Sequence, residues 1–189
     1  QGRLSPKSTR ADTIAGGNRT RPPLRADFRV NPIRGAGVKM RIAIASDHAA
    51  LELKAALVQW LGEAGHDVSD LGPHDGTSVD YPDYGYKLGR SVAAGDADRG
   101  IALCGSGIGI SIAVNRNPAC RCALVSEPLS AKLCREHNDA NVLAMGARLV
   151  GIEMAKACIE AFLNTAFGGD RHVRRVSKLS NPVFAKDPA

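Results

Sequence analysis

The chain has 189 residues, of which 44% are hydrophobic, and a formal net charge of +6. These values are typical of one globular domain, and no apolar run approaches the roughly 20 residues that a membrane-spanning helix needs. Residues 1–39 carry nine Lys or Arg and two Asp, a balance of +7, while the other 150 residues carry sixteen Lys or Arg and seventeen Asp or Glu, a balance of −1. The body of the chain therefore offers no general electrostatic case for binding nucleic acid.

Residues 1–39 are predicted to be a disordered basic N-terminal extension. They are rich in Arg, Pro and Gly, and their four prolines oppose a continuous helix. We interpret them as sequence upstream of a natural start at Met40, with a transit peptide and a functional basic arm as alternatives. Residues 181–189 are expected to form a C-terminal tail, so the folded domain is predicted to span residues 40–180.

From Met40 onward, short apolar strands alternate with helical patterns. Strands are predicted at residues 41–46, 66–71, 100–104, 121–125 and 142–144, and helices at residues 50–65, 82–94, about 109–115, 128–137 and 151–167. This alternation predicts an α/β fold, a three-layer αβα sandwich around a five-stranded parallel Rossmann-like sheet. In such folds ligands bind at the carboxyl ends of the strands.

The third predicted strand ends in Cys104, and a loop with Gly105, Gly107 and Gly109 follows it. Free backbone N–H groups beside a helix start would bind anions and stabilise a thiolate. A dinucleotide site is disfavoured, because it needs G-x-G-x-x-G after the first strand, and no Gly-Lys-Ser/Thr closes the loop as in a P-loop. The structural alternatives are a tight turn that needs glycine for its backbone angles and a cysteine that is only a small hydrophobe.

Two more polar pairs follow predicted strands, Asp47-His48 after the first and Ser126-Glu127 after the fourth. Topology should bring them near Cys104. Asp47 could instead be a helix N-cap. His137-Asn138-Asp139 closes the fourth predicted helix, where Asn138 could be only the left-handed residue that ends it.

Arginines follow the last strand and precede the C-terminal tail. Arg148 lies just past the fifth predicted strand, and Arg171 and Arg175 are four residues apart. On a helix the last two would share one face and could hold a phosphate together, with a solvated basic face as the alternative.

The five cysteines are an odd number without a C-x-x-C pair, which indicates free thiols in a reducing compartment. Cys120, Cys122, Cys134 and Cys158 fall on predicted apolar faces. No metal site is predicted, because Cys120 and Cys122 lack neighbouring ligands for zinc.

Several of these segments recur together, in the same order and spacing, in a known family. They are Ser46-Asp47-His48, Asp80-Tyr81-Pro82, Cys104 to Ser111, Ser126-Glu127-Pro128, His137 to Asn141 and Gly146-Ala147-Arg148. On these motifs residues 40–180 resemble ribose-5-phosphate isomerase type B, of the sugar-phosphate isomerase family that includes galactose-6-phosphate isomerase subunits.

The resemblance implies an aldose–ketose isomerase that interconverts ribose 5-phosphate and ribulose 5-phosphate in the pentose phosphate pathway, through a cis-enediolate. It implies that Cys104 moves the proton between C2 and C1, that His137 protonates the ring oxygen, and that Asp47 contacts the sugar hydroxyls. Ser106 stands where many members have threonine and keeps the hydroxyl. Substrate-binding roles are implied for His48, Tyr81, Gly105, Gly107, Ile108, Gly109, Asn138, Arg148, Arg171 and Arg175.

The resemblance further implies a homodimer, or a tetramer, whose active site is shared between two subunits. It implies no cofactor and no metal, and we expect a cytoplasmic enzyme with no nucleic-acid or membrane partner. Two alternatives stay open: an isomerase of hexose 6-phosphates of the allose or galactose type, and a non-catalytic phosphosugar-binding module that would not need Cys104 or His137.

Overall fold

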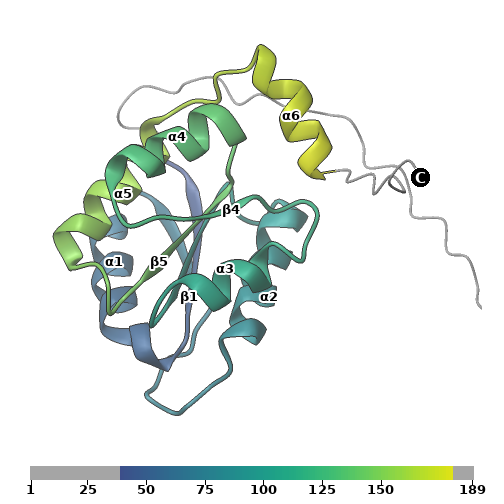
Figure 1. Ribbon diagram of the computed structural model, residues 1–189. Coiled ribbons are helices and arrows are strands. Elements are labelled where there is room, and N and C mark those ends of the chain that lie inside the picture. Colours follow the sequence, from purple (N-terminus) through teal and green to yellow (C-terminus); the bar gives the residue numbers. More distant parts are fainter. Residues whose placement is uncertain (1–38, 181–189) are drawn as a thin grey trace, which may run out of the picture.

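The computed structural model describes residues 39–180, so the predictions for residues 1–38 and 181–189 lie outside it (Figure 1). Five strands form one parallel sheet in the order β2-β1-β3-β5-β4, which confirms the predicted sheet. The strands are β1 Arg41–Ser46, β2 Asp67–Asp70, β3 Arg99–Cys104, β4 Cys122–Leu124 and β5 Val142–Gly146. Within the described range no helix is long and apolar enough to cross a bilayer.

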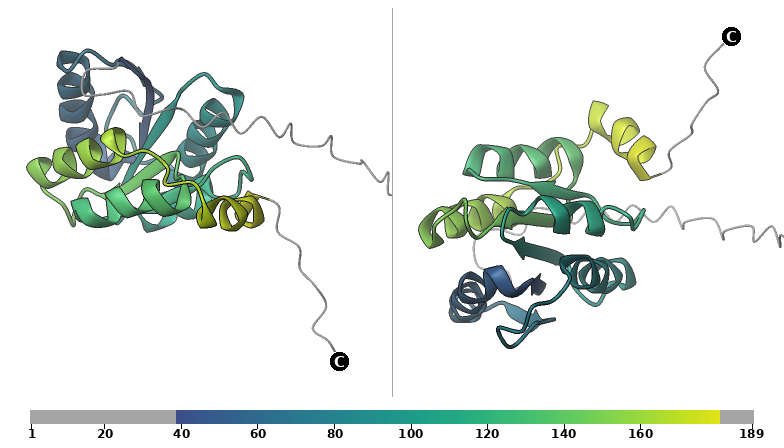
Figure 2. Two further views of the ribbon diagram at one scale, coloured as in Figure 1. Left: turned by 90° about the horizontal axis from the view of Figure 1, so that it is seen from above. Right: turned by 60° about the horizontal axis from the view of Figure 1, so that its bottom comes forward.

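The helices cover both faces of this sheet (Figure 2). They are α1 Leu51–Glu63, α2 Tyr81–Ala94, α3 Ile108–Val114, α4 Pro128–Asn138, α5 Ile152–Asn164 and α6 Arg171–Ser180, with a short 3-10 turn, η1 His48–Ala50, before α1. Side chains alternate between the two faces of a strand. Ile42 and Ile44 accordingly lie in one core with α1, α4 and α5, while Ala43 and Ala45 lie in the other with α2 and α3. This arrangement confirms the three-layer sandwich.

The strand order places β1 and β3 side by side at the point where the chain changes direction across the sheet. The chain leaves β1 toward β2 at one edge, and it leaves β3 toward β4 at the other. Loops after two such strands diverge and leave room for a ligand between them. Asp47 follows β1 and Cys104 ends β3, so the fold brings both to this position.

Some predicted boundaries were wrong. The last long helix ends at Asn164 rather than residue 167, because Thr165 adopts an extended conformation. The residue with left-handed geometry after α4 is Asp139, with φ 46°, and not Asn138, which is still helical. Asp139 takes this conformation while its carboxylate pairs with two arginines, a contact that a local pattern cannot reveal.

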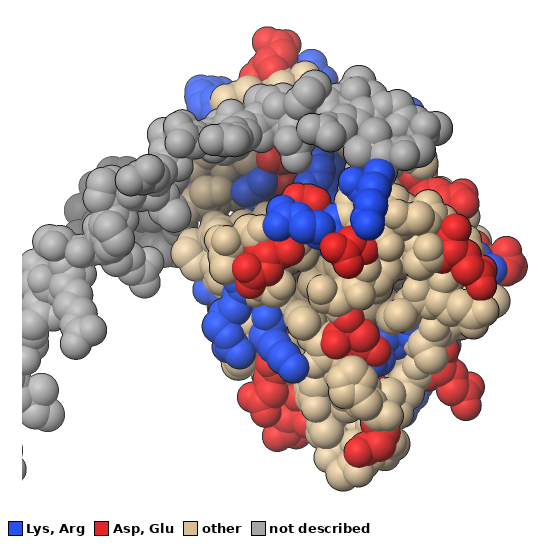
Figure 3. Space-filling model, turned by 180° about the vertical axis from the view of Figure 1, so that it is seen from behind, with Lys and Arg blue, Asp and Glu red and all other residues tan. Residues whose placement is uncertain are grey.

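Helix α6 stands outside the sandwich, beside the end of α4 (Figures 1 and 2). It carries Arg171 and Arg175 and was not among the predicted helices, although the spacing of these arginines was considered for one. On the face shown in Figure 3, Lys and Arg side chains are interspersed with Asp and Glu. This mixture agrees with the near-neutral charge balance of residues 40–189.

Candidate active site

The thiol of Cys104 faces the glycine loop. Its side chain is only 3% exposed, and its Sγ atom accepts a hydrogen bond of 3.0 Å from the backbone N–H of Gly107. Such a bond from a backbone donor stabilises a sulfur anion more than a neutral thiol. The sulfur therefore points at the backbone donors, as the sequence predicted, although hydrophobic side chains surround its other side.

The loop packs directly against the backbone at the end of β5. This close approach leaves no room for side chains, which explains why the loop contains glycines. A Cβ atom at Gly107, whose φ is +76°, would lie 2.7 Å from the backbone carbon of Met145. A Cβ atom at Gly146 would lie 2.5 Å from the backbone carbon of Ser106. No side chain fits at either position, so the backbone of the loop contacts the backbone at the end of β5 directly.

Two side chains cover the remaining glycines of the loop. The guanidinium of Arg148 lies 3.3 Å from where a Cβ of Gly105 would be, and the Tyr81 ring lies 2.5 Å from where a Cβ of Gly109 would be. The N–H of Arg148 also donates to the carbonyl of Gly105, at 3.0 Å. Arg148 and Tyr81 therefore flank the loop.

Asp47 and His48 reach the same edge of the sheet from β1. The N–H of Asp47 donates to the carbonyl of Leu103 at 3.1 Å, and its Oδ1 atom accepts from the N–H of Ala49 at 3.0 Å. This second bond is the N-cap that the sequence offered as an alternative. Nδ1 of the exposed His48 ring accepts from the N–H of Val79 at 3.2 Å. A ring nitrogen that accepts carries no proton, so Nε2 is left as the donor of the neutral ring.

We call these residues the thiol cluster: Asp47, His48, Tyr81, Cys104 to Gly109 and Arg148. Ser106 contributes a hydroxyl that accepts from the N–H of Ile108 at 3.3 Å. Glu127, in contrast, is an N-cap: its carboxylate accepts from the N–H groups of Leu129 and Ser130, both at 2.6 Å. Hydrogen bonds from Ser130 lower the pKa of Glu127, so the Glu127 carboxylate stabilises the amino end of α4.

The other predicted residues form a second group, the histidine–arginine cluster: His137, Asn138, Arg171 and Arg175, together with His172. The rings of His137 and His172 stack with centroids 4.6 Å apart and planes 8° from parallel. Desolvation, then the nearby His137, Arg171 and Arg175, lower the pKa of His172. The sequence analysis missed His172, although its position next to Arg171 in a basic helix was an available signal.

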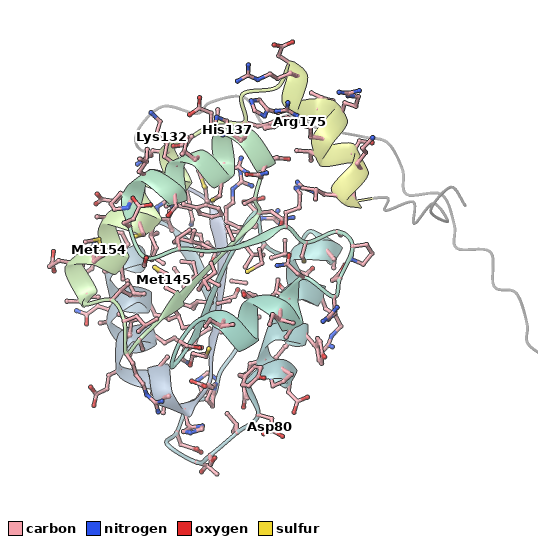
Figure 4. The ribbon with its side chains drawn as sticks, viewed as in Figure 1. Asp80, Lys132, His137, Met145, Met154 and Arg175 are labelled. Carbon is pink, nitrogen blue, oxygen red and sulfur yellow. The ribbon has the colours of Figure 1, made fainter. Side chains whose placement is uncertain are left out.

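The two clusters lie at opposite ends of the strands: the thiol cluster at the carboxyl ends and the histidine–arginine cluster at the amino ends. In Figure 4, His137 and Arg175 are at one end of the molecule and Asp80, next to Tyr81, is at the other. The carbonyl of Asn138 accepts from Nε of Arg121, which precedes β4, whereas Cys104 ends β3. Since β3 has six residues, its two ends are about 17 Å apart at roughly 3.3 Å per residue. One chain therefore does not bring His137, Asn138, Arg171 or Arg175 to Cys104.

The charges of the predicted phosphate ligands are uncompensated. Among residues 39–180, no salt bridge involves Arg148, Arg171 or Arg175, and all three side chains are exposed. Guanidinium groups in this state are available for an anionic ligand, and arginine pairs well with phosphate oxygens.

The other four cysteines are poorly suited to nucleophilic or ligand chemistry. Burial raises the pKa of Cys120 and of Cys134 to about 11, and burial also raises the pKa of Cys122 and Cys158. All five cysteines are free thiols. Over residues 39–180 no three His, Cys, Asp or Glu side chains are grouped as metal ligands would be.

A cavity of about 660 Å³ lies beside the thiol cluster, between the start of α1 and the turn before α5. His48 and Glu52 are its polar side chains, and the rest of its lining is aliphatic or glycine. Cys104 does not line this cavity.

The chain is similar to known isomerases. Residues 42–179 match the family described as Ribose/Galactose Isomerase. Ribose-5-phosphate isomerase B of Escherichia coli is 44% identical over 140 residues, which cover 74% of this chain and 94% of that protein. A galactose-6-phosphate isomerase subunit of Clostridium acetobutylicum is 34% identical over 78% of this chain and 86% of its own. The structure of a type B ribose 5-phosphate isomerase from Thermotoga maritima superposes with a TM-score of 0.74 at 48% identity, covering 75% of this chain and 97% of that one.

Proposed function

Because the chain belongs to the ribose/galactose isomerase family, we propose that it interconverts ribose 5-phosphate and ribulose 5-phosphate. The observation that carries the proposal is the Cys104 sulfur accepting the N–H of Gly107, beside β1 and within a loop of backbone donors. A base and an anion-stabilising group side by side are what proton transfer next to a carbonyl requires. A phosphosugar-binding module would have no use for the thiol.

In the proposed mechanism the Cys104 thiolate removes the proton from C2 of the open-chain aldose. The electron pair of that C–H bond forms the C1–C2 double bond of a cis-enediolate, and the carbonyl oxygen at C1 becomes the oxyanion. Backbone N–H groups of Gly105 to Gly109 stabilise this charge, with the Ser106 hydroxyl nearby. The proton of the C2 hydroxyl then passes to the C1 oxyanion, the thiol returns its proton to C1, and the electron pair left on the C2 oxygen forms the ketone.

The remaining roles belong to ring opening and binding. His137 donates a proton to the ring oxygen, and Asp47 and Asn138 orient the sugar hydroxyls. The phosphate is bound by the His48 ring and by Arg148, Arg171 and Arg175, whose guanidinium charges have no salt-bridge partner among the described residues. Binding energy at the phosphate holds the reacting carbons in place. No metal is needed, because the loop donors take up the negative charge.

We further propose that the working enzyme is a dimer in which each thiol cluster meets the histidine–arginine cluster of the other subunit. The separation of the two clusters supports this arrangement, since a single chain holds only half of each site. Exposed apolar side chains near the loop also support it, because Ile108, Ile112 and Leu124 are 51%, 50% and 45% exposed. Apolar surface of this kind is typical of a subunit interface. A tetramer would be a pair of such dimers.

A hexose 6-phosphate is the second candidate substrate, favoured by the similarity to the galactose-6-phosphate isomerase subunit. The purified protein should be incubated with ribose 5-phosphate and, separately, with allose 6-phosphate, with a chelator present, and ketose formation measured. Faster turnover of the pentose at equal concentration supports the proposal. Turnover of the hexose alone would assign the second candidate, and no ketose from either sugar would contradict isomerisation.

The cytoplasm suits this reaction, because the thiol must stay reduced.

A further inference from the structure

The turn that ends α4 has a backbone conformation that a non-glycine residue rarely adopts. Asp139 has φ 46° and ψ 43°, and it directly follows His137 and Asn138. Its N–H donates to the carbonyl of Arg135 at 3.1 Å, which closes the helix. An aspartate tolerates this conformation better than most residues but does not impose it. Contacts of the side chain must therefore help to keep the turn in place.

The Asp139 carboxylate is shared by two arginines. Its Oδ2 atom accepts from Nη2 of Arg121 and its Oδ1 atom from Nη1 of Arg135, both at 2.8 Å. Arg135 is only 4% exposed, so the Asp139 carboxylate is the partner that compensates its buried charge. A third guanidinium lies nearby: burial and the proximity of Arg135 lower the pKa of Arg99 to about 10, while Asp139 and Asp98 raise it.

The same arginines tie the turn to the neighbouring elements. Nε of Arg121 donates to the carbonyls of Asn138 and Asp139, at 3.2 and 2.8 Å, which fixes the turn to the start of β4. Nη1 of Arg135 donates to the carbonyl of Ala140 at 2.6 Å, and its Nε donates to the carbonyl of Thr165 at 3.3 Å. The end of α4 is therefore held from the sheet on one side and from the end of α5 on the other.

The segment leading to α6 is attached to this same end of α4. The N–H of Gly168 donates to the carbonyl of Glu136 at 2.8 Å, and His172 stacks on His137. A displacement of the turn would therefore move His137, Asn138 and the start of α6 together. All the members of the histidine–arginine cluster depend on where this turn lies.

We propose that Asp139 is a positioning residue: its carboxylate, shared by Arg121 and Arg135, fixes the turn that presents His137 and Asn138 to the thiol cluster of a second copy of the chain. The expected effect of Asp139 on catalysis rests on the proposed function. The effect of the carboxylate on the position of the His137 ring does not depend on which sugar is isomerised.

Three substitutions separate the carboxylate from the backbone conformation. Asp139→Gly removes the carboxylate but adopts φ 46° freely, Asp139→Asn keeps a side chain that tolerates it, and Asp139→Ala loses both. Arg121→Gln is the milder variant, since it leaves the pair between Arg135 and Asp139 intact. Arg41→Gln is the matched control, because it breaks another Arg–Asp pair, with Asp98 at 2.7 Å, and keeps the Asp98 carboxylate beside Arg99.

The measurements are kcat and KM for ribose 5-phosphate and the NMR signals of the His137 and His172 rings. For folded Asp139→Gly and Asp139→Asn we expect kcat to fall by about tenfold to a hundredfold, as for a misplaced reacting group, and KM to rise as well, because the start of α6 moves with the turn. The kcat of Arg121→Gln should fall less, and the kcat of Arg41→Gln should not change. The ring signals should shift in the Asp139 and Arg121 variants and stay unchanged in the control.

Unchanged kcat and unchanged ring signals in folded Asp139 variants would overturn the proposal, and so would a loss of kcat that only follows the unfolded fraction. If Asp139→Ala does not fold, Arg121→Gln and the ring signals still decide. Failure of the proposed function looks different: the wild-type protein would then form no ketose, while the ring signals would still report whether Asp139 holds the turn.

Discussion

The Cys104 sulfur and the Gly107 amide are joined by a hydrogen bond of 3.0 Å, so the thiol is fixed against the loop that would stabilise the charge it creates. Replacing Cys104 with Ala removes the base and leaves this loop and the arginines intact. We expect kcat to fall by about 10²- to 10⁴-fold, the range for general acid–base catalysis, while phosphate binding is retained. Steady-state kinetics and a phosphate titration measure the two effects.

The control for this variant is Cys120→Ala, which removes another buried thiol on the same face of the sheet. Its Sγ atom contacts the carbonyl of Gly89 at 3.4 Å and takes no part in the loop. The control should lose about 1 kcal/mol of stability and keep its kcat. Equal turnover by Cys104→Ala and the wild type would remove the thiol from the mechanism.

Sharing of the site between subunits can be tested by complementation. Cys104→Ala and His137→Ala should each be inactive alone. If the variants are mixed, unfolded and refolded together, half of the dimers combine one of each and contain one intact site, so we expect about a quarter of wild-type activity. Activity that stays at the level of the separate variants, in a mixture shown to contain mixed dimers, would place both residues in one subunit's site.

The glycine at 107 is required by space as well as by conformation. In Gly107→Ala the new Cβ would lie 2.6 Å from Leu124 Cδ1 and 2.7 Å from the Met145 carbon, at φ +76°. We expect a loss of about 3 kcal/mol in the free energy of unfolding, from backbone strain and overpacking together. Gly65→Ala is the control, because Gly65 has φ +88° with nothing within 4 Å, and it should lose only about 1 to 2 kcal/mol. Chemical denaturation measures both, and equal losses would show that the close approach to β5 does not matter.

Arg175 is predicted to bind the substrate phosphate. Arg175→Ala should raise KM for ribose 5-phosphate by about ten- to a hundredfold, the effect of losing a charge-assisted hydrogen bond, with little change in the melting temperature. Arg90→Ala replaces an exposed arginine on α2 and should leave KM unchanged. An Arg175 variant that melts earlier but binds substrate normally would assign this residue a structural role only.

The pKa of His172 should lie below its ordinary value, because of desolvation and then because of His137 and the arginines of α6. A histidine with a lowered pKa binds its proton more tightly in the unfolded chain, so it reduces stability as the pH falls below about 6.5, and this effect is absent above that pH. His137→Asn removes one cause and should raise the pKa of His172 in an NMR titration. An unchanged titration would show that the stacked ring has no influence.

Much of the fold follows from local patterns, and the structure confirms it. Four of the five strands contain an apolar run bounded by turn residues, and helices α1 to α5 carry helical spacing, so their order could be predicted. Strand β2 is mostly polar, and α6 was not predicted. The boundaries were less certain where tertiary contacts decide them. Asp139 rather than Asn138 takes the left-handed conformation while Arg121, eighteen residues earlier in the chain, pairs with its carboxylate.

By itself the sequence determined that a thiol follows a buried strand and enters a loop of glycines, because backbone freedom and strand order are properties of neighbouring residues. Only the tertiary structure decided that the backbone of β5 packs against this loop, that His172 stacks on His137, and that His137 and Cys104 lie at opposite ends of the strands. The physical reason is that these relationships depend on the direction in which each helix returns across the sheet and on the side chains it meets there. Spacing along the chain does not contain that information.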